Sequence, residues 1–397
     1  MPVQSREPES RSRRATAISR AVVILGAMLG LIAAAPLHPY RTAAGMIKLV
    51  EQSAHVGDCD QCHTAHGQGP VVYEHALIGP DENSLCDRCH NTPWAGGSYA
   101  GAWLFEGSAH GSGVGTVWPG PVPPARTEAG AAGKCLNCHD PHGWQDAAGL
   151  IPRLTLAREE ALCLTCHDGS PASTNIGLDF NKTYRHPVTA YRDRHRGPLE
   201  SLSSDFAAAP ANNRHSECVD CHDPHVAARD HAGTPPAPEL SRANLGVSRL
   251  LVQNGPAGTA PAFTFAAGSD TVTTPIAEYQ LCFKCHSSWT TQPTGQPDLA
   301  MELNPANASY HPVEAAGRDP AIQGGSFVPG WSANSLTRCD DCHGSEFPGA
   351  PRGPHGSSYR YILRQPYEAS SRARNMAADE ICFACHAYDV YGNPNAP

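Results

Sequence analysis

The sequence predicts a mostly irregular chain with short α-helices and short β-segments, built around something other than a conventional apolar core. Three observations carry this prediction. The chain has 37 Gly and 36 Pro among 397 residues, and only 7% of its residues are aromatic. Such a composition disfavours long helices and strands and supplies little apolar bulk. The third observation is the spacing of its 16 Cys.

All 16 Cys fall in C-x-x-C pairs, and a His directly follows every pair. Numbered as motifs one to eight in chain order, the pairs are Cys59/Cys62, Cys86/Cys89, Cys135/Cys138, Cys163/Cys166, Cys218/Cys221, Cys282/Cys285, Cys339/Cys342 and Cys382/Cys385. The residues that follow them are His63, His90, His139, His167, His222, His286, His343 and His386. C-x-x-C-H is the attachment signal for a c-type haem, in which both thiols add to the haem vinyl groups and the His ligates the iron. The spacing therefore predicts eight covalent haems c with their irons, and these haems supply the missing core around which the short helices form.

Zinc sites and redox disulfides also use paired Cys, so both compete with haem as explanations. Neither requires a His after every second Cys. His makes up 21 of the 397 residues, so one such His is about a 5% event by chance. Eight such positions in a row exclude chance, and haem is the interpretation that explains all of them.

The N-terminal residues have the pattern of an export signal. Five Arg lie within the first 20 residues, and the apolar run 21–35 follows them. That run is short for a membrane-spanning helix, which needs roughly 20 residues. Residues 1–45 are therefore predicted to be either a cleaved signal peptide or a retained anchor in the inner membrane. Both interpretations place the protein outside the cytoplasm, in the periplasm or beyond the cell.

The chain repeats as four two-haem units, predicted at 46–93, 94–180, 181–295 and 296–397. In each unit an acid and an aliphatic residue precede the even-numbered motif, which predicts a short helix that runs into the motif. The odd-numbered motif is followed by a nearby His. A short aliphatic run then follows in several units, at 150–153, 250–252 and 361–364, and predicts an extended segment.

The sixth iron ligand decides between an electron carrier and an enzyme. Eight of the 21 His belong to the motifs, and thirteen remain. We expect each unit to supply two of these as distal ligands, one downstream and one upstream of its odd motif. The downstream candidates are His66, His142, His225 and His355, and the upstream candidates are His55, His110, His186 and His311. His38, His75, His195, His215 and His231 are spares, with His215 a rival of His186 and with His38 and His75 rivals of His55.

The downstream position has a geometric consequence. His142 comes three residues after His139, and that span is at most about 10 Å. His139 already holds one face of its own haem, so His142 cannot pass round the ring to the other face. We therefore expect His142, and likewise His66 and His225, to ligate a neighbouring haem.

These motifs resemble the multihaem c-type cytochromes of the doubled C-x-x-C-H family, often written C-x-x-C-H-D-P-H-G. The resemblance covers nearly all of residues 50–390, and it is most specific at 135–143 and 218–225. It implies a multihaem cytochrome c architecture and a periplasmic or surface electron carrier. Redox proteins or terminal electron acceptors would be its partners.

The sequence thus predicts electron transfer along bis-His haems, without enzymatic activity. The alternative is an octahaem reductase of nitrite, hydroxylamine or a sulfur oxyanion with one open haem. Such enzymes resemble this chain in haem number but often carry Lys in place of one motif His, whereas all eight motifs here end in His. A third interpretation is a self-assembling subunit of an extracellular haem filament or an outer-membrane conduit.

The charge pattern narrows the partners. The net charge is −9, and no stripe of Lys and Arg occurs beyond the first 20 residues. Binding to nucleic acid is excluded on this ground. Haem propionates would add negative charge, so a basic or metal-ion partner is the easier electrostatic match.

Overall fold

A computed structural model describes most of the chain from residue 135 onward and parts of it before. The described ranges are 39–41, 47–49, 62–64, 77–79, 83–90, 102–112, 135–143, 145–146, 149–151, 155–188, 216–227, 235–268, 276–290, 296–319, 322–368 and 375–395. The predictions for residues 1–35, Cys59, His55, His66 and the five spare His lie outside these ranges, as does the side chain of Cys89.

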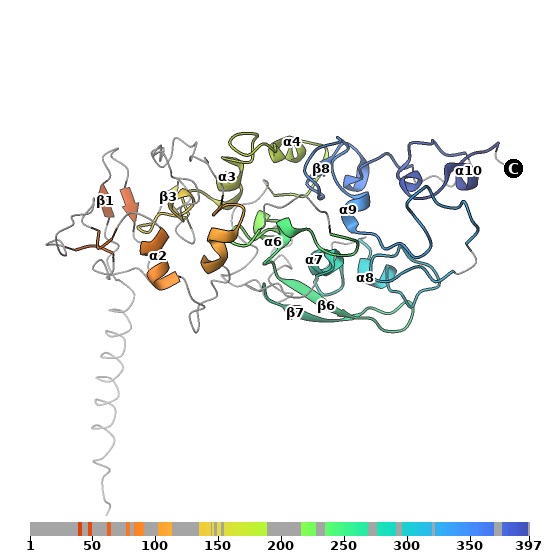
Figure 1. Cartoon of the computed structure of the whole chain (residues 1–397), viewed down its shortest axis with the longest axis horizontal. Coiled ribbons are helices and arrows are strands. Elements are labelled where there is room, and N and C mark those ends of the chain that lie inside the picture. Colours follow the sequence, from red (N-terminus) through yellow and green to blue (C-terminus); the bar gives the residue numbers. More distant parts are fainter. Residues whose placement is uncertain are drawn as a thin grey trace, which may run out of the picture.

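Elements from the first part of the chain lie at one end of the longest axis and those from the last part at the other, while β8 (Gly356–Ser357) lies back beside α4 (Ile176–Phe180) (Figure 1). The strands β1 (Pro39–Arg41) and β2 (Ile47–Leu49) lie at one end, and helix α10 (Tyr388–Tyr391) lies at the other. Repeat proteins have this one-dimensional order because each repeat packs on its neighbours alone. The arrangement agrees with a chain built from successive units.

The helices are short, as the sequence predicted. Three of them run into even-numbered motifs, namely α2 (Asn83–His90), α3 (Glu159–Leu164) and α7 (Glu278–His286). Acidic residues open α3 and α7, where they favour the helix dipole. The others are η3 (Ala102–Gly107), η4 (Cys135–Asn137), α4 (Ile176–Phe180), α6 (Cys218–Cys221), η7 (Arg242–Asn244), α8 (Leu299–Glu302), α9 (Cys339–Cys342), η8 (Arg360–Ile362) and η9 (Ile381–Ala384), where η marks a 3₁₀ helix. Within the described ranges, no helix is both long and apolar enough to cross a membrane.

The strands form two-stranded antiparallel pairs. These are β1–β2, β3 (Gln145–Asp146) with β4 (Gly149–Leu150), β5 (Tyr184–Arg185) with β8 (Gly356–Ser357), and β6 (Arg249–Gln253) with β7 (Ala262–Ala266). The β5–β8 pair joins the third unit to the fourth, with Tyr184 opposite Ser357. The extended run predicted at 250–252 lies in β6. The one predicted at 361–364 is wrong, because Tyr361 and Ile362 have φ of 63° and 57° and belong to η8.

The apolar core is small. One cluster joins Leu250, Phe283 and Ala300 where the β6–β7 hairpin packs on α7. A second joins Leu240, Val247, Ile276 and Leu281 beside Cys221. Both clusters surround α7, and the described parts of the other units have no comparable cluster. The prediction of a mostly irregular chain is confirmed, while haems as its core stay a prediction.

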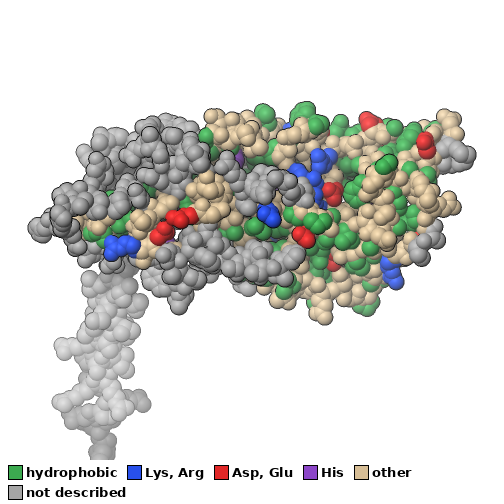
Figure 2. Space-filling model, in the orientation of Figure 1, with side chains coloured by type: hydrophobic (Ala, Val, Ile, Leu, Met, Phe, Trp, Pro, Cys, Tyr) green, Lys and Arg blue, Asp and Glu red, His purple; other side chains and the backbone are tan. Residues whose placement is uncertain are grey.

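The described surface carries few charges. On the face shown in Figure 2, hydrophobic and uncharged side chains predominate, and the charged ones are scattered among them. No continuous basic stripe runs across the described part of this face.

An ion cluster fastens the start of the third unit to the fourth. Lys182 Nζ lies 2.8 Å from both Asp179 Oδ1 and Glu346 Oε2, and it donates to Ser345 Oγ at 2.6 Å. Burial acts to raise the pKa of Glu346, but hydrogen bonds from Lys182 and Ser358 outweigh it and lower the pKa to about 2. This carboxylate therefore stabilises the fold above its ordinary pKa, and the contribution is lost as the pH falls towards 2.

We expect Lys182→Met to lower the free energy of unfolding by about 1.5–3 kcal/mol at pH 7, because the buried Asp179 and the partly buried Glu346 lose a charged donor. Denaturant unfolding followed by circular dichroism measures the change. The matched control is Ser345→Ala, which removes the bond from Lys182 to a neutral hydroxyl and keeps both carboxylates. Lys182→Met should weaken the pH dependence of stability below pH 5, and the control should not. If the free energy of unfolding of Lys182→Met fell below pH 5 as steeply as that of the wild-type protein, this account would be wrong.

Candidate haem-attachment sites

The described thiols are positioned in contacts that repeat along the chain. Fourteen Cys are described as thiols, and none of these forms a disulfide. The first Cys of an even motif lies within hydrogen-bond reach of the first Cys of the next odd motif. This occurs at Cys86/Cys135, Cys163/Cys218 and Cys282/Cys339. A haem on an even motif would therefore attach beside the haem of the following odd motif.

The second Cys of each motif follows a different pattern, which operates within one unit. The second Cys of an odd motif lies close enough to the second Cys of the even motif in its own unit for the charge of one to affect the other. This occurs at Cys138/Cys166, Cys221/Cys285 and Cys342/Cys385. The two motifs of a unit are thus brought together at their second thiols, while successive units meet at their first thiols.

Two of the predicted haem-binding Cys, Cys62 and Cys285, have defined backbone positions. Cys285 lies in the last turn of α7, and Cys62 accepts the Ile78 backbone N–H at 2.9 Å through its carbonyl. Both residues are half-buried. In the first unit the counterpart of Cys62 would be Cys89, whose side chain is outside the described residues. None of these contacts tests a thioether bond, so haem attachment at Cys62 and Cys285 stays a prediction.

Besides the contact between their first thiols, successive units are joined by a hydrogen bond from a backbone N–H to a side-chain oxygen. The residue that opens each even helix accepts a backbone N–H from the start of the next odd motif. Asn83 Oδ1 accepts from Cys135 at 2.9 Å, Glu159 Oε1 from Val219 at 2.8 Å, and Glu278 Oε2 from Asp340 at 3.0 Å. Burial and neighbouring carboxylates raise the pKa of Glu159 to about 8 and that of Glu278 to about 7. The junction is thus one local structure used three times.

The odd motifs share a contact with the chain that follows them. The carbonyl of the second Cys accepts a backbone N–H from Ile78, Leu156 and Arg364 in motifs one, three and seven, at 2.9 Å each. In motif five the side-chain amide of Asn244 takes the place of this backbone N–H and donates to the Cys221 carbonyl at 2.7 Å. These contacts fix the motif His, which in motifs one, three and seven forms a β-bridge with the same segment.

Five pairs of imidazole rings face each other across a constant gap. Each pair joins one motif His to one of the predicted distal His. The centroid distances are 5.8 Å for His63/His142, 6.0 Å for His167/His110, 6.1 Å for His139/His225, 6.2 Å for His286/His186 and 6.2 Å for His222/His355. A metal holds an imidazole nitrogen at about 2 Å and the ring centre lies about 1 Å further, so two rings across one metal are about 6 Å apart. The observed gaps fit an iron between the rings.

The relative orientation of the rings alternates. In the three odd-motif pairs the ring planes meet at 26°, 11° and 14°, which is close to parallel. In the two even-motif pairs they meet at 80° and 63°, which is closer to perpendicular. Odd and even motifs therefore offer two distinct axial geometries.

The Nδ1 atoms of several of these rings have partners. His110 Nδ1 lies 3.0 Å from Pro224 O, and His186 Nδ1 lies 2.6 Å from Pro354 O. The motif residue His222 has the same arrangement, with Nδ1 2.9 Å from Ala243 O. An Nδ1–H bound to a carbonyl leaves the lone pair on Nε2, which is the form that binds a metal.

The Asp-Pro-His sequence after motifs three and five positions its own His. Asp140 Oδ1 accepts the His142 backbone N–H at 2.9 Å and lies 3.3 Å from its Nδ1. Asp223 does the same for His225, at 2.9 Å and 3.4 Å. Asp140 is fully buried. The carboxylate thus orients the downstream ring.

The pairs follow one rule along the chain. A downstream His lies against the odd motif of the preceding unit, as His142 does against His63. An upstream His lies against the even motif of its own unit, as His186 does against His286. The spacing predicted that His142 serves a neighbouring haem, and it lies beside His63 rather than across from His139. His186 lies against His286, and its rival His215 lies outside the described ranges.

The two predicted distal residues of the fourth unit also lie near motif His. His355 follows His343 by twelve residues, yet it still lies against His222. His311 lies close enough to His386 for its charge to act on that ring. Burial is the larger cause that lowers the pKa of His386, and the charge of His311 is the second. His311 and His186 share the same tight turn, in which Val313 and Val188 donate back to their carbonyls at 2.9 Å. The ligand role of each His stays a prediction.

The buried rings are in the neutral form that ligation needs. Burial and the neighbouring His225 lower the pKa of His139 to about 4, and burial with His222 lowers that of His355 to about 3. Burial also raises the pKa of the Cys138, Cys221 and Cys342 thiols to about 12. No group of three or more metal-binding side chains occurs among the described residues.

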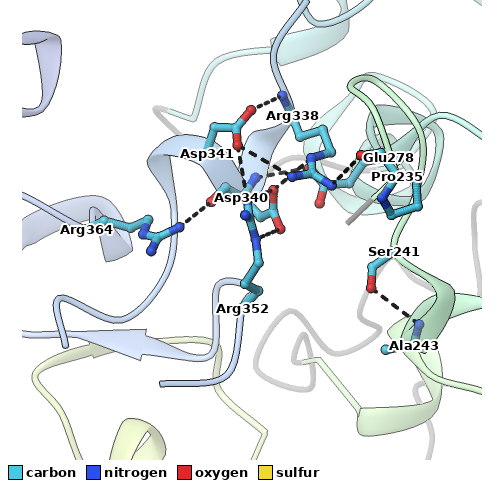
Figure 3. Close-up of polar contacts among 9 residues, drawn as sticks. All are labelled: Pro235, Ser241, Ala243, Glu278, Arg338, Asp340, Asp341, Arg352 and Arg364. Carbon is cyan, nitrogen blue, oxygen red and sulfur yellow. Dashed lines mark hydrogen bonds and ion pairs between the residues drawn. The ribbon is translucent and has the colours of Figure 1, made fainter. Parts of the chain in front are cut away.

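An ion network surrounds α9 at the seventh motif (Figure 3). Arg352 lies 2.8 Å from Asp340 and 3.0 Å from Asp341, and the buried Arg338 lies 3.3 Å from Asp340. Arg338 also donates to Pro235 O at 3.3 Å, which reaches into the third unit. The network holds the seventh motif against the sixth, beside the Glu278 junction.

Comparison with known proteins bears on the third and fourth motifs. Residues 128–172 match the family model described as the doubled CXXCH motif. No curated protein and no solved structure matches the chain. The family match, together with the ring pairs, supports a multihaem c-type cytochrome with covalently bound haem.

Proposed function

We propose that this protein transfers electrons along eight covalent haems c outside the cytoplasm. The observation that carries the proposal is the set of imidazole pairs about 6 Å apart at successive motifs. An iron with two protein ligands has no position for a substrate, so it exchanges electrons only. Multihaem c-type cytochromes are typically exported, in keeping with the signal-like residues 1–45.

The haem iron supplies the redox change, and the chain supplies attachment, ligation and spacing. The thiols fix each haem to a short helix. The carbonyls of Pro224 and Pro354 and the carboxylates of Asp140 and Asp223 hold the distal rings. Because each such segment touches two units, neighbouring haems are kept at a short, fixed distance, which electron hopping requires.

The partners follow from the same chemistry. Electrons would enter from a redox protein and leave to another protein or a terminal acceptor. Residues 1–45 would be removed on export or would hold the protein at the inner membrane. The second candidate function, an octahaem reductase of nitrite, hydroxylamine or a sulfur oxyanion, needs one iron without a distal His. The absence of any departure from C-x-x-C-H disfavours it.

The haem load is the direct test of the proposal. We expect the denatured holoprotein to exceed the mass of its polypeptide by eight haems, because all 16 Cys belong to motifs. A reductive titration should then take up eight electrons per chain. Intact-mass spectrometry and a titration followed at the haem absorption bands make the two measurements. A colourless protein that contains zinc instead of haem would refute the proposal.

The alternating ring orientations predict two kinds of low-spin iron. The angle between axial imidazole planes sets the splitting of the iron d orbitals, so parallel and perpendicular pairs give different signals. We expect the oxidised protein to show both a rhombic and a strongly anisotropic low-spin signal by electron paramagnetic resonance. A single low-spin class would contradict the alternation.

The assignment of His186 can be tested against its rival. We expect His186→Ala to turn one low-spin haem of the strongly anisotropic class high-spin, because His286 then loses the facing ring. His215→Ala is the matched control and should leave all spin states unchanged. Resonance Raman and electron paramagnetic resonance report the change. The opposite outcome for the two variants would move the ligand to His215.

A further inference from the structure

Two of the downstream histidines have a carboxylate beside the ring nitrogen Nδ1. Asp140 Oδ1 lies 3.3 Å from His142 Nδ1, and Asp223 Oδ1 lies 3.4 Å from His225 Nδ1. In the ring pairs, these two histidines face the proximal residues of motif one and motif three. If each haem takes the number of its motif, haems one and three therefore have distal ligands that are backed by a carboxylate.

The distal ring at haem five provides a matched comparison. Gly353 stands two residues before His355, where the earlier units have Asp, and it has no side chain that could bring a charge to the ring. In other respects His355 resembles His225. Their planes meet those of the facing rings at 14° and 11°, with centroids 6.2 Å and 6.1 Å apart. Phe180 lies edge-on to His355 at 5.9 Å, and Phe105 lies edge-on to His225 at 6.1 Å. The carboxylate is the feature that distinguishes these two rings.

A carboxylate at Nδ1 acts on the iron through the ring. It draws the Nδ1 proton towards itself and makes Nε2 a stronger donor to the metal, which favours ferric over ferrous iron. Its negative charge favours the ferric state as well. Both effects lower the reduction potential, and hydrogen bonding around the axial ligand is one means by which a protein sets that potential. Asp140 is fully buried and the Asp223 side chain is 17% exposed, so water screens these charges only in part.

We propose that Asp140 and Asp223 are positioning residues that lower the potentials of haems one and three below that of haem five, and so give the electron path a direction. The proposal rests on the proposed function, since it needs haems that are ligated by His142 and His225. One electron leaves a ferrous iron in the first or second unit, which becomes ferric, and it reduces the ferric iron of haem five. No bond and no proton moves in this step. Electrons therefore run from the N-terminal units towards the third unit.

Asp140→Asn and Asp223→Asn test the proposal in the holoprotein. An Asn side chain keeps the Oδ1 atom that accepts the His142 or His225 backbone N–H at 2.9 Å, but it removes the charge. We expect each variant to shift the midpoint potential of one haem upward. Its equilibrium constant for reduction should rise about tenfold, the scale on which outer partners of a metal ligand act, and this corresponds to about 59 mV for one electron. Potentiometric titration, followed at the low-spin signals by electron paramagnetic resonance, measures the shift.

Asp168→Asn is the matched control. Asp168 also comes directly after a motif His, and its Oδ1 accepts a backbone N–H two residues further on, from Ser170 at 3.2 Å. The variant thus removes a charge from the same kind of turn, but Ser170 stands where the distal His would be. We expect all midpoint potentials to stay unchanged. Asp140→Glu keeps the charge and should keep the potential of haem one close to that of the wild-type protein.

Several results would overturn the proposal. Unchanged potentials in both Asn variants, with eight low-spin haems retained, would show that the carboxylates do not set them. An equal shift in Asp168→Asn would reduce the effect to the loss of a negative charge anywhere near a haem. A high-spin iron or a lost haem in Asp140→Asn and in Asp223→Asn would mean that the carboxylates only hold the rings in place. Each of these outcomes leaves the eight haems of the wild-type protein intact, whereas a wild-type protein without them would refute the proposed function.

Discussion

The structure depends on one constraint, the fixed gap between two imidazole rings that face each other. A metal–nitrogen bond of about 2 Å on each side leaves little tolerance, and five pairs lie within 5.8–6.2 Å. A chain with small apolar clusters and short helices could not impose such precision by packing alone. Local contacts hold the rings instead. These are the contacts of Nδ1 atoms with Pro carbonyls, the carboxylates of Asp140 and Asp223, and the hydrogen bonds that join successive units.

The same constraint explains the extended shape of the molecule. His142 and His225 each lie against the odd-motif His of the preceding unit, so both Asp-Pro-His segments link two units. The junctions at Asn83, Glu159 and Glu278 add a second link from each even motif to the next odd one. Links that only join neighbours build a row, which is the arrangement in Figure 1.

The sequence was sufficient for whatever depends on local spacing. The motif His, the short helices at Glu159 and Glu278, and the reach of His142 to another haem all follow from residues a few positions apart. It could not assign each distal ring to its iron, since that choice depends on how units pack. It also failed at Tyr361, where an aliphatic run predicted an extended segment but Tyr361 and Ile362 have positive φ and the Tyr361 carbonyl lies 2.8 Å from His343 Nδ1.

The fourth unit shows how the pairing rule survives a change in sequence. Its downstream segment has no Asp two residues before His355; Gly353 stands there instead, and a Cβ at that position would meet the His355 ring at 3.3 Å. The insertion that precedes it is tied back by Arg352, which pairs with Asp340 and Asp341 in the motif itself. The ion network thus replaces the single carboxylate of the earlier units. It brings Pro354 and His355 to the third unit by a longer route.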